Sequence, residues 1–297
     1  MDLFGKIRRK IFGNNIDADL LAWEGAAGPV LTEDQLRFWN ENGYLVLENF
    51  FPDNRIDRVN ALIDEIWQNR KDSQLVIDAF IGTDREKRMS FAETGEEVRK
   101  EPYKLNDLFL EYDDVRDLVL DEKLCRIMAD LLKGDPLVCN GLSFERGSQQ
   151  DFHFDTFYMP PPVSNKMVAS WIALEEAGPE SGPLRYYPGS HNIDPYHFSD
   201  GRLNAIEGEM DNFREYIRQQ LDFFGLEATT FLPKKGDVLI WHAQLFHGGG
   251  EIEDKEATRK SLVSHYFRAA DFPADRVKSY GKGRHALVKE HQRISDL

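Results

Sequence analysis

The spacing of apolar residues predicts helices in the first part of the chain. A helix is expected between Thr32 and Gly43, because Thr32 with Gln35 fits a capping box and Gly43 is a natural helix stop. Apolar residues recur at steps of three and four over residues 53–69, which predicts a second helix. A Leu-rich stretch over residues 114–133 predicts a third helix, which ends before a glycine.

Beyond residue 134 the pattern changes to short apolar runs separated by turn residues, which is typical of β-strands. The predicted strands cover residues 136–145, 150–158, 166–174, 183–187, 236–247 and 259–268. One amphipathic helix, at about 205–223, interrupts this series and is expected to be either a lid over a pocket or a structural cover. The polar segment 72–103 shows no clear period and is expected to be a loop with short pieces of structure.

These elements predict a mainly β fold with α-helices, in which N-terminal helices pack on a β-barrel or sandwich. No repeat or flexible linker divides the chain, so one domain is expected over residues 1–297. Its expected parts are an N-terminal extension (1–30), a helical support region (31–134), a β core (135–270) with an insertion (192–232), and a C-terminal tail (271–297).

Composition and charge limit the classes of function. The hydrophobic content of 41% is that of a globular protein, and the net charge of -15 argues against nucleic-acid binding. No apolar run is long enough for a transmembrane helix, and no secretory signal is recognised, so a soluble, cytoplasmic protein is expected. Cys125 and Cys139 are expected to be reduced. The basic amphipathic residues 1–12 either pack on the body, stay partly ordered or contact a membrane surface. The oligomeric state is left open.

His153 and Asp155 carry the first candidate chemistry. In a strand, residues two apart point to the same face, so an imidazole and a carboxylate can meet at one point. They supply two of the ligands in an iron site of two histidines and one carboxylate. His242 and His247 are the candidates for the third ligand, and in an unbroken strand only one of them faces the metal. We choose His247, which lies beside three glycines, and expect His242 to be a core or supporting histidine.

Arg259 and Ser261 share one face of a further strand. A guanidinium grips a carboxylate with two hydrogen bonds, and a hydroxyl adds another, which suits the far carboxylate of a dicarboxylate cosubstrate. The 2-oxo acid end of such a molecule could chelate the metal. His265 lies on the same face, and we expect it to be a buried structural histidine. Tyr158 and Met159 either line the substrate pocket or pack in the core.

Several short blocks, in order along the chain, resemble the phytanoyl-CoA dioxygenase family of iron(II)- and 2-oxoglutarate-dependent oxygenases. The blocks are residues 31–36, 42–47, 147–150, 153–155, 171–174, 181–184, 188–191, 236–238, 247–250 and 259–261. The resemblance implies a double-stranded β-helix core, the jelly roll of cupin-like proteins.

The resemblance also implies roles for single residues. His153, Asp155 and His247 match the iron ligands, and Arg259 matches the arginine that pairs with the 2-oxoglutarate carboxylate. Trp171 matches an aromatic beside the cosubstrate, with plain core packing as the alternative, and Lys104 resembles a lysine that touches it. Family members often carry Ser where this chain has Gly249, and Ser261 can supply the missing hydroxyl.

The expected reaction is hydroxylation of an unactivated C–H bond in a small-molecule or lipid-linked substrate, with 2-oxoglutarate and O2 consumed and succinate and CO2 released. Ascorbate is expected to support the activity in vitro. In related halogenases a small residue stands at the position of Asp155, so hydroxylation or desaturation is expected over halogenation. The alternative is a non-redox cupin-like metal-binding protein or a zinc hydrolase with the same three ligands. Such a protein would not need Arg259 and Ser261 behind the metal.

Overall fold

The computed structural model describes residues 29–80 and 86–291. Its helices are α3 (Glu33–Asn42), α4 (Asp53–Gln68), α5 (Asp113–Val119), α6 (Glu122–Leu132) and α7 (Met210–Phe224). Its strands are β1 (Tyr44–Leu47), β2 (Val76–Ala79), β3 (Lys87–Ser90), β4 (Tyr103–Asn106), β5 (Pro136–Phe144), β6 (Met167–Ala173), β7 (Leu184–Tyr186), β8 (Thr229–Phe231), β9 (Val238–His242), β10 (His247–Gly249), β11 (Ser261–Arg268), β12 (Val277–Ser279) and β13 (His285–Leu287).

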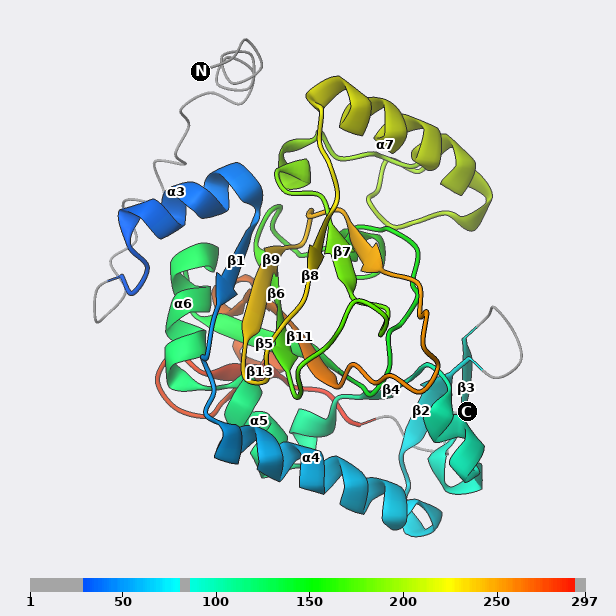
Figure 1. The fold of residues 1–297 in the computed structure, drawn as a ribbon. Coiled ribbons are helices and arrows are strands. Elements are labelled where there is room, and N and C mark those ends of the chain that lie inside the picture. Colours follow the sequence, from blue (N-terminus) through cyan, green and yellow to red (C-terminus); the bar gives the residue numbers. More distant parts are fainter. Residues whose placement is uncertain (1–28, 81–85, 292–297) are drawn as a thin grey trace.

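The strands form two sheets. The large sheet has the order β1-β9-β6-β11-β5-β4-β2-β3, with β13 beside β5 and β12 beside β13. The small sheet has the order β10-β7-β8. All pairings are antiparallel except that between β13 and β5. The small sheet lies across one face of the large sheet (Figure 1), which confirms the predicted mainly β, jelly-roll class of fold.

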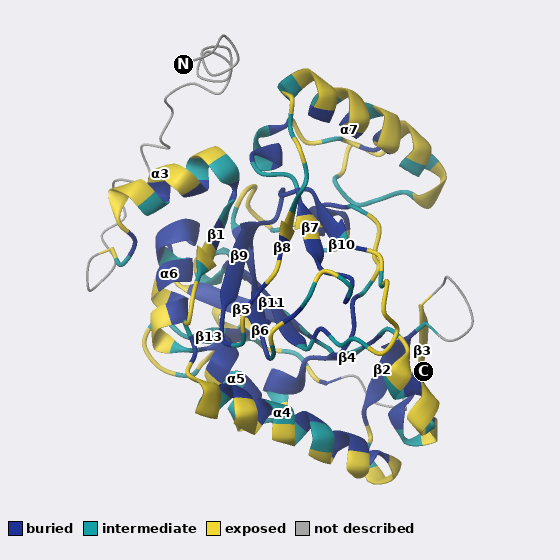
Figure 2. Ribbon diagram, viewed as in Figure 1, coloured by how far each residue is buried: buried dark blue, intermediate teal, exposed yellow. Residues whose placement is uncertain are grey.

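Strand alternation divides the core into two layers. On β6, Val168 and Ile172 point to the helical side and pack in the main hydrophobic core. Ala169, Trp171 and Ala173 point the other way, into a second cluster with residues of the small sheet. Both faces of the central strands are therefore buried, as Figure 2 shows. The space between the two sheets is where a site can be built.

The N-terminal helices cover the outer face of the large sheet. Ile56, Val59 and Ile63 of α4 are buried in the main core, and α6 contacts β5, β6 and β11. The predicted capping box of α3 is confirmed, since Thr32 accepts a hydrogen bond from Gln35 N and the Gln35 side chain bonds back to Thr32. Gly43 ends this helix with φ of 76°, a left-handed conformation that favours glycine.

The predicted single helix over 114–133 is wrong, because the chain breaks between α5 and α6. Asp121 is the N-cap of α6, and its carboxylate accepts hydrogen bonds from Lys123 N at 3.0 Å and Leu124 N at 3.1 Å. A side chain that satisfies free amide groups in this way starts a new helix. The apolar residues of both helices pack into one core, so their spacing looks continuous in the sequence.

Two predicted strands are also wrong. The run 236–247 is not one strand: β9 ends at His242, a turn follows, and β10 begins at His247 in the other sheet. The run 150–158 contributes only a single bridge, between His153 and His247, and then a 3-10 turn over Asp155–Phe157. The expected loop 72–103 contains β2 and β3, which with β4 extend the large sheet.

The predicted helix at 205–223 is α7, which begins at Met210 after a 3-10 turn. Its buried residues Phe213, Ile217 and Leu221 pack on an aromatic cluster that includes Phe154 and Phe246. The helix covers the aromatic side of the loop that carries His153 and Asp155.

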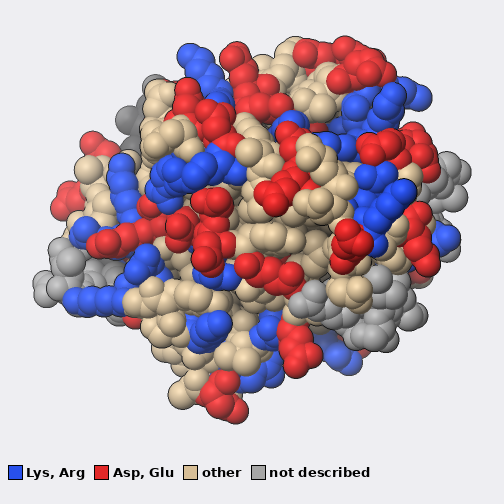
Figure 3. Space-filling model, turned by 90° about the horizontal axis from the view of Figure 1, so that it is seen from below, with Lys and Arg blue, Asp and Glu red and all other residues tan. Residues whose placement is uncertain are grey.

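Both cysteines are buried free thiols. Within the part of the chain that the structure describes, no helix is both long and apolar enough to cross a membrane. On the face seen in Figure 3, Lys and Arg side chains are interspersed with Asp and Glu. Residues 1–12, for which a membrane contact was considered, lie outside the described residues. The one-domain division and the absence of a nucleic-acid partner stay predictions.

Candidate metal centre and its cavity

The structure brings His153, Asp155 and His247 together. Backbone hydrogen bonds in both directions, of 2.8 and 3.1 Å, join His153 to His247 and set their imidazole centroids 4.4 Å apart. Asp155 follows in the 3-10 turn, where its amide donates to the carbonyl of Ala243 at 3.1 Å. One ligand atom from each of the three lies within 4.8 Å of the others, and all three side chains are buried. The residues meet across a bridge and a turn, not on one strand face as predicted.

Each of the two histidines has one ring nitrogen next to a backbone carbonyl and the other free of it. Nδ1 of His153 lies 2.8 Å from the carbonyl oxygen of Asp151, and Nδ1 of His247 lies 2.8 Å from that of Leu245. Because a carbonyl oxygen only accepts, each Nδ1 carries the hydrogen and each Nε2 keeps a lone pair for a cation. Burial, together with the neighbouring His247, lowers the pKa of His153 to about 3, so this imidazole is neutral at physiological pH.

Asp155 is held in one orientation. Its Oδ2 accepts a 2.8 Å hydrogen bond from the indole Nε1 of Trp241 on β9. Its Oδ1 faces Nε2 of His153 at 3.8 Å and Nε2 of His247 at 3.5 Å. Burial would raise the pKa of the Asp155 carboxyl, but the surrounding imidazoles, His247 first, bring it well below its usual range. Two imidazole nitrogens and one carboxylate oxygen on one side, with a cavity opposite, fit a divalent cation such as iron(II) with open coordination positions.

Arg259 lies in the same cavity and has no counter-ion among the residues that the structure describes. It is only 3% exposed, and its Nε and Nη1 have no hydrogen-bond partner among residues 29–80 and 86–291. Burial lowers its pKa to about 10, so it remains a cation at neutral pH. Its guanidinium carbon lies 5.7 Å from the ring centre of Trp171. A buried, unpaired guanidinium in a cavity is a strong binding group for a carboxylate.

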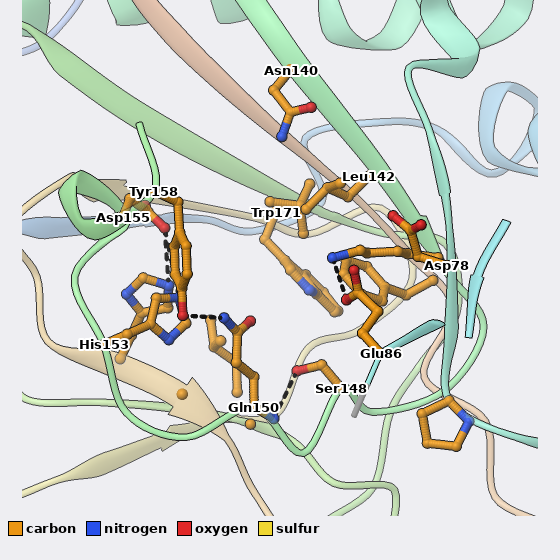
Figure 4. A pocket seen from close by; sticks show the side chains of 18 of the residues that line it. Asp78, Glu86, Asn140, Leu142, Ser148, Gln150, His153, Asp155, Tyr158 and Trp171 are labelled. Carbon is orange, nitrogen blue, oxygen red and sulfur yellow. Dashed lines mark hydrogen bonds and ion pairs between the residues drawn. The ribbon is translucent and has the colours of Figure 1, made fainter. Parts of the chain in front are cut away.

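The cavity has a volume of about 510 Å³ and lies between the two sheets. Figure 4 shows His153 and Asp155 on one side of it, Asp78 and Glu86 on the opposite side, and Trp171 between them. Tyr158 and Met159, left open by the sequence, line the cavity. None of the described residues that line it belongs to α7.

Two ion pairs are part of the cavity wall. Arg88 on β3 makes two hydrogen bonds to the buried Asp78 on β2, of 2.6 and 2.7 Å. Lys104 on β4 lies 2.6 Å from Glu86. Each of these cations therefore has a carboxylate partner within the wall, unlike Arg259.

Lys104 and Ser261 have less direct access to a cosubstrate in the cavity than the sequence analysis expects. Lys104 lines the cavity, but its ammonium group is bound to Glu86. Ser261 is fully buried and is not among the described residues that line the cavity; its Oγ has no hydrogen-bond partner in the described chain. Their contacts with a cosubstrate stay predictions.

Gly249, the position where family members often carry Ser, has no room for a side chain. A Cβ at this position would lie 2.7 Å from the backbone N of Gln149 and 2.9 Å from Oγ of Ser148. Ser148 lines the cavity, whereas Ser261 does not. The hydroxyl nearest to the position of the missing serine therefore comes from Ser148, which the sequence analysis did not single out.

The other two histidines near the site lie in different places. His242 packs against Trp39 and His191, with ring centres 6.1 and 5.4 Å away, and is not part of the cavity wall. The turn between β9 and β10, and not strand parity, separates it from His247. His265 does line the cavity, and its Nε2 lies 3.5 Å from Oδ1 of Asp155.

Trp241, like Ser148, is a cavity residue that the sequence analysis missed. The alternation of β9 could have found it, because Leu239 and Trp241 share the face that points between the sheets. What alternation cannot supply is its partner, since Asp155 is far away in the sequence.

Comparisons with known proteins agree with this architecture. The family profile described as Phytanoyl-CoA dioxygenase (PhyH) matches residues 39–260. The mouse protein "Phytanoyl-CoA dioxygenase, peroxisomal" is 26% identical over 259 residues, which cover 80% of this chain and 68% of that protein. The Caenorhabditis elegans "Probable phytanoyl-CoA dioxygenase" is 24% identical over 258 residues, covering 80% and 76%.

Solved structures show the same fold. The non-heme alpha ketoglutarate dependent carbocyclase SnoK from nogalamycin biosynthesis has a TM-score of 0.61 and 17% identity, over 82% of this chain and 88% of SnoK. EctD from S. alaskensis, solved with 2-oxoglutarate and 5-hydroxyectoine, has a TM-score of 0.59 and 16% identity, over 85% and 82%. Because the family profile spans most of the sequence, the chain belongs to the phytanoyl-CoA dioxygenase family and is a 2-oxoglutarate-dependent dioxygenase that uses iron(II), 2-oxoglutarate and O2.

Proposed function

We propose that this protein hydroxylates an unactivated C–H bond of a small-molecule substrate, with His153, Asp155 and His247 as iron ligands and Arg259 as the anchor of 2-oxoglutarate. The observation that carries the proposal is the buried Arg259, which has no ion-pair partner in the described part of the chain and shares its cavity with the three candidate ligands. A zinc hydrolase or a cupin-like binding protein could use the same ligands. Such a protein would bind no dicarboxylate to pair with Arg259, and the cost of burying this charge would not be offset.

Each residue has a distinct part in this proposal. Bound iron(II) would supply the redox chemistry that couples decarboxylation of 2-oxoglutarate, to succinate and CO2, with oxidation of the substrate by O2. Arg259 would bind the far carboxylate, so that the 2-oxo acid end is directed toward the metal side of the cavity. Trp171, against the Arg259 guanidinium, would limit how the cosubstrate can lie. The buried ligands would keep water away from the reacting groups.

The hydroxyl and ammonium groups near the cosubstrate have secondary parts. Ser148 lies on the cavity wall beside Gly249 and would supply the hydroxyl that the family's serine supplies elsewhere. Ser261 is buried in the core, so it would act on the cosubstrate only indirectly, through the position of the Arg259 side chain. Lys104 would have to leave Glu86 to reach 2-oxoglutarate, so we assign it first to the wall around the substrate.

The wall also favours one kind of substrate. Its apolar members include Phe80, Leu142, Phe144 and Met159, which suit a hydrocarbon portion of a substrate in the cavity. The relatives are named for phytanoyl-CoA, whose phosphates need cations. Arg88 and Lys104, however, already have carboxylate partners. We therefore favour a compact, uncharged or zwitterionic substrate over an acyl-CoA.

The outcome of oxidation follows from Asp155. With Asp155 as a ligand, its carboxylate would take the place that a halide would need on bound iron, which favours transfer of oxygen over halogenation. We also propose a cytoplasmic location, because two buried thiols without a disulfide suit a reducing compartment. Cell fractionation tests the location. Recovery of the protein with peroxisomes, the compartment in the name of the mouse relative, would contradict it.

The first experiment separates the oxygenase from the alternative. Purified, metal-free protein is titrated without O2, first with iron(II) and then with 2-oxoglutarate. A weak visible absorption band that needs both, and that is lost in the Arg259→Leu variant, is the expected result. Tight zinc binding without such a band would favour the hydrolase.

The second experiment identifies the reaction. 2-Oxoglutarate consumption is measured with O2 and ascorbate over sugars, amino acids, fatty acyl groups, acyl-CoA esters and secondary metabolites. A product heavier by one oxygen atom is expected. Failure to bind 2-oxoglutarate or to turn it over with any substrate in the panel would refute the proposed function.

A further inference from the structure

His265 is a buried titratable group in the cavity wall that the proposed function does not use. It lies on β11, is 4% exposed, and belongs to the same strand face as Val263. Its Nε2 is 3.5 Å from Oδ1 of Asp155, and its ring meets that of Trp241 edge to face, with centres 6.4 Å apart. The imidazole is thus next to the candidate carboxylate ligand, on a different strand from Trp241.

The two oxygens of Asp155 have different neighbours. Oδ2 accepts the hydrogen bond of Trp241, and Oδ1 faces the histidine nitrogens. Oδ1 is therefore the oxygen available to a cation. A carboxylate oxygen has two lone pairs, so one can bind the cation while the other accepts a hydrogen bond. Among the described residues, the three-ligand group consists of His153, Asp155 and His247. His265 also lies next to Oδ1 but is not one of these ligands, so it can donate the hydrogen bond.

The tautomer of His265 agrees with a donor role. Its buried Nδ1 has no hydrogen-bond partner in the described chain. A buried N–H without an acceptor is less common in proteins than an acceptor without a donor, so the hydrogen belongs on Nε2, where a carboxylate is near. The 3.5 Å separation lies just beyond the usual N–H···O range of about 2.7–3.2 Å.

We propose that His265 is a positioning residue of the iron site: its imidazole donates Nε2–H to Oδ1 of Asp155, opposite the indole that holds Oδ2. This inference rests on the proposed function, because it requires Asp155 to be a ligand. With both oxygens held, the carboxylate cannot rotate to bind through two oxygens. A two-oxygen carboxylate would occupy a position that 2-oxoglutarate and O2 require, so His265 would keep that position open.

Two amide substitutions test the donor. The amide nitrogen of Gln can take the place of Nε2, whereas that of Asn corresponds to Nδ1 and does not reach Asp155. Both variants keep a polar side chain of similar bulk, so the two substitutions should change the stability of the fold to a similar extent. His285→Asn is the matched control, because His285 Nε2 is also 3.5 Å from a carboxylate, that of Asp135, but outside the cavity wall.

The measurements are iron(II) affinity by anaerobic titration and the position of the visible band formed with 2-oxoglutarate, after circular dichroism has confirmed folding. His265→Asn should lower iron(II) affinity about 10- to 100-fold, as loss of a ligand's hydrogen-bond partner typically does, and shift the band. His265→Gln and His285→Asn should retain the wild-type affinity and band.

The outcomes distinguish a failure of the proposed function from a failure of the role proposed for His265. If wild-type protein binds neither iron(II) nor 2-oxoglutarate, the proposed function fails. If wild type binds both and His265→Asn behaves identically, only the role of His265 is overturned. If Gln weakens iron binding as much as Asn does, His265 is not a hydrogen-bond donor to Asp155, and this result also overturns the inference.

Discussion

The indole Nε1 of Trp241 donates a 2.8 Å hydrogen bond to Oδ2 of Asp155. Trp241 projects from β9, a strand paired on both sides in the large sheet, and Asp155 lies in a short 3-10 turn. The bond therefore ties the orientation of a loop residue to the sheet. Supporting hydrogen bonds of this kind determine which oxygen of a carboxylate faces a metal.

Replacement of Trp241 by Phe removes this bond and keeps most of the ring. We expect iron(II) affinity to fall about 10- to 100-fold, because Asp155 can then rotate. The free energy of unfolding should fall by about 1–3 kcal/mol, the cost of a buried acceptor without its donor. Anaerobic titration and urea unfolding measure the two effects.

Trp67→Phe is the matched control for this variant. Trp67 donates a buried 2.7 Å hydrogen bond to the hydroxyl of Tyr103, away from the three candidate ligands. The Trp67→Phe variant should be less stable than wild type but should keep the wild-type iron(II) affinity. Equal loss of iron affinity in both variants would mean that Trp241 acts only through general stability.

Arg259→Leu should separate cosubstrate binding from stability. Loss of a buried charge that pairs with a ligand costs about 2–5 kcal/mol, so 2-oxoglutarate should bind at least about 30-fold more weakly. Iron(II) binding without cosubstrate should not change. The metal-free variant should be at least as stable as wild type, because Nε and Nη1 of the guanidinium have no hydrogen-bond partner in the described chain.

Arg259→Lys should give an intermediate affinity for 2-oxoglutarate, because an ammonium keeps the charge without the two-fold hydrogen bond. Titration of the iron-loaded, oxygen-free protein and urea unfolding of the metal-free protein measure these effects. An unchanged 2-oxoglutarate affinity in the Leu variant would remove Arg259 from the cosubstrate site.

Gly249→Ser restores the residue that family members often carry, yet it should destabilise this protein. The new Cβ would lie 2.7 Å from the backbone N of Gln149, and backbone gives way less easily than a flexible side chain. We expect a loss of about 1–3 kcal/mol in the free energy of unfolding and weaker 2-oxoglutarate binding. Gly208→Ser is the control, since nothing lies within 4 Å of its Cβ position. A stable, more active Gly249→Ser variant would show that Ser148 is not the substitute hydroxyl.

The stability of the metal-free protein should decrease as pH falls from 6.5 to 4. Burial, with a smaller contribution from Lys166, lowers the pKa of His242 from 6.5 to about 4 in the folded state. Between these values the unfolded chain binds more protons than the folded one. This group therefore contributes a slope of about 1.4 kcal/mol per pH unit, and its full stabilisation is present above pH 6.5.

His242→Asn should reduce that slope by the same amount. The amide oxygen of Asn can replace Nδ1 as the acceptor for Gln244 N, which lies 3.1 Å away, and it does not titrate. Urea unfolding between pH 4.5 and 7, with a chelator present, measures the difference. Parallel profiles for the two proteins would contradict a buried, neutral His242.

Much of the local chemistry was accessible from the sequence. The capping box at Thr32, the period of α4 and most core strands depend on neighbours within a few residues, and the structure agrees with them. His153-x-Asp155 and Arg259 could be singled out because their residue types suit a cation and a carboxylate. The mainly β class followed from the series of short strands, and the jelly roll followed from the family resemblance; both are confirmed.

Other features depend on contacts between distant parts of the chain, and only the tertiary structure decided them. The break at Asp121 depends on a side chain that caps a helix although the apolar period continues. His247 reaches His153 because a turn moves the chain from one sheet to the other, which periodicity does not reveal. Trp241 and His265 reach Asp155 from separate strands, and Ser148 stands where Gly249 leaves no room. Residue types therefore determined which ligands the site can bind, whereas packing of the two sheets determined which atoms face them.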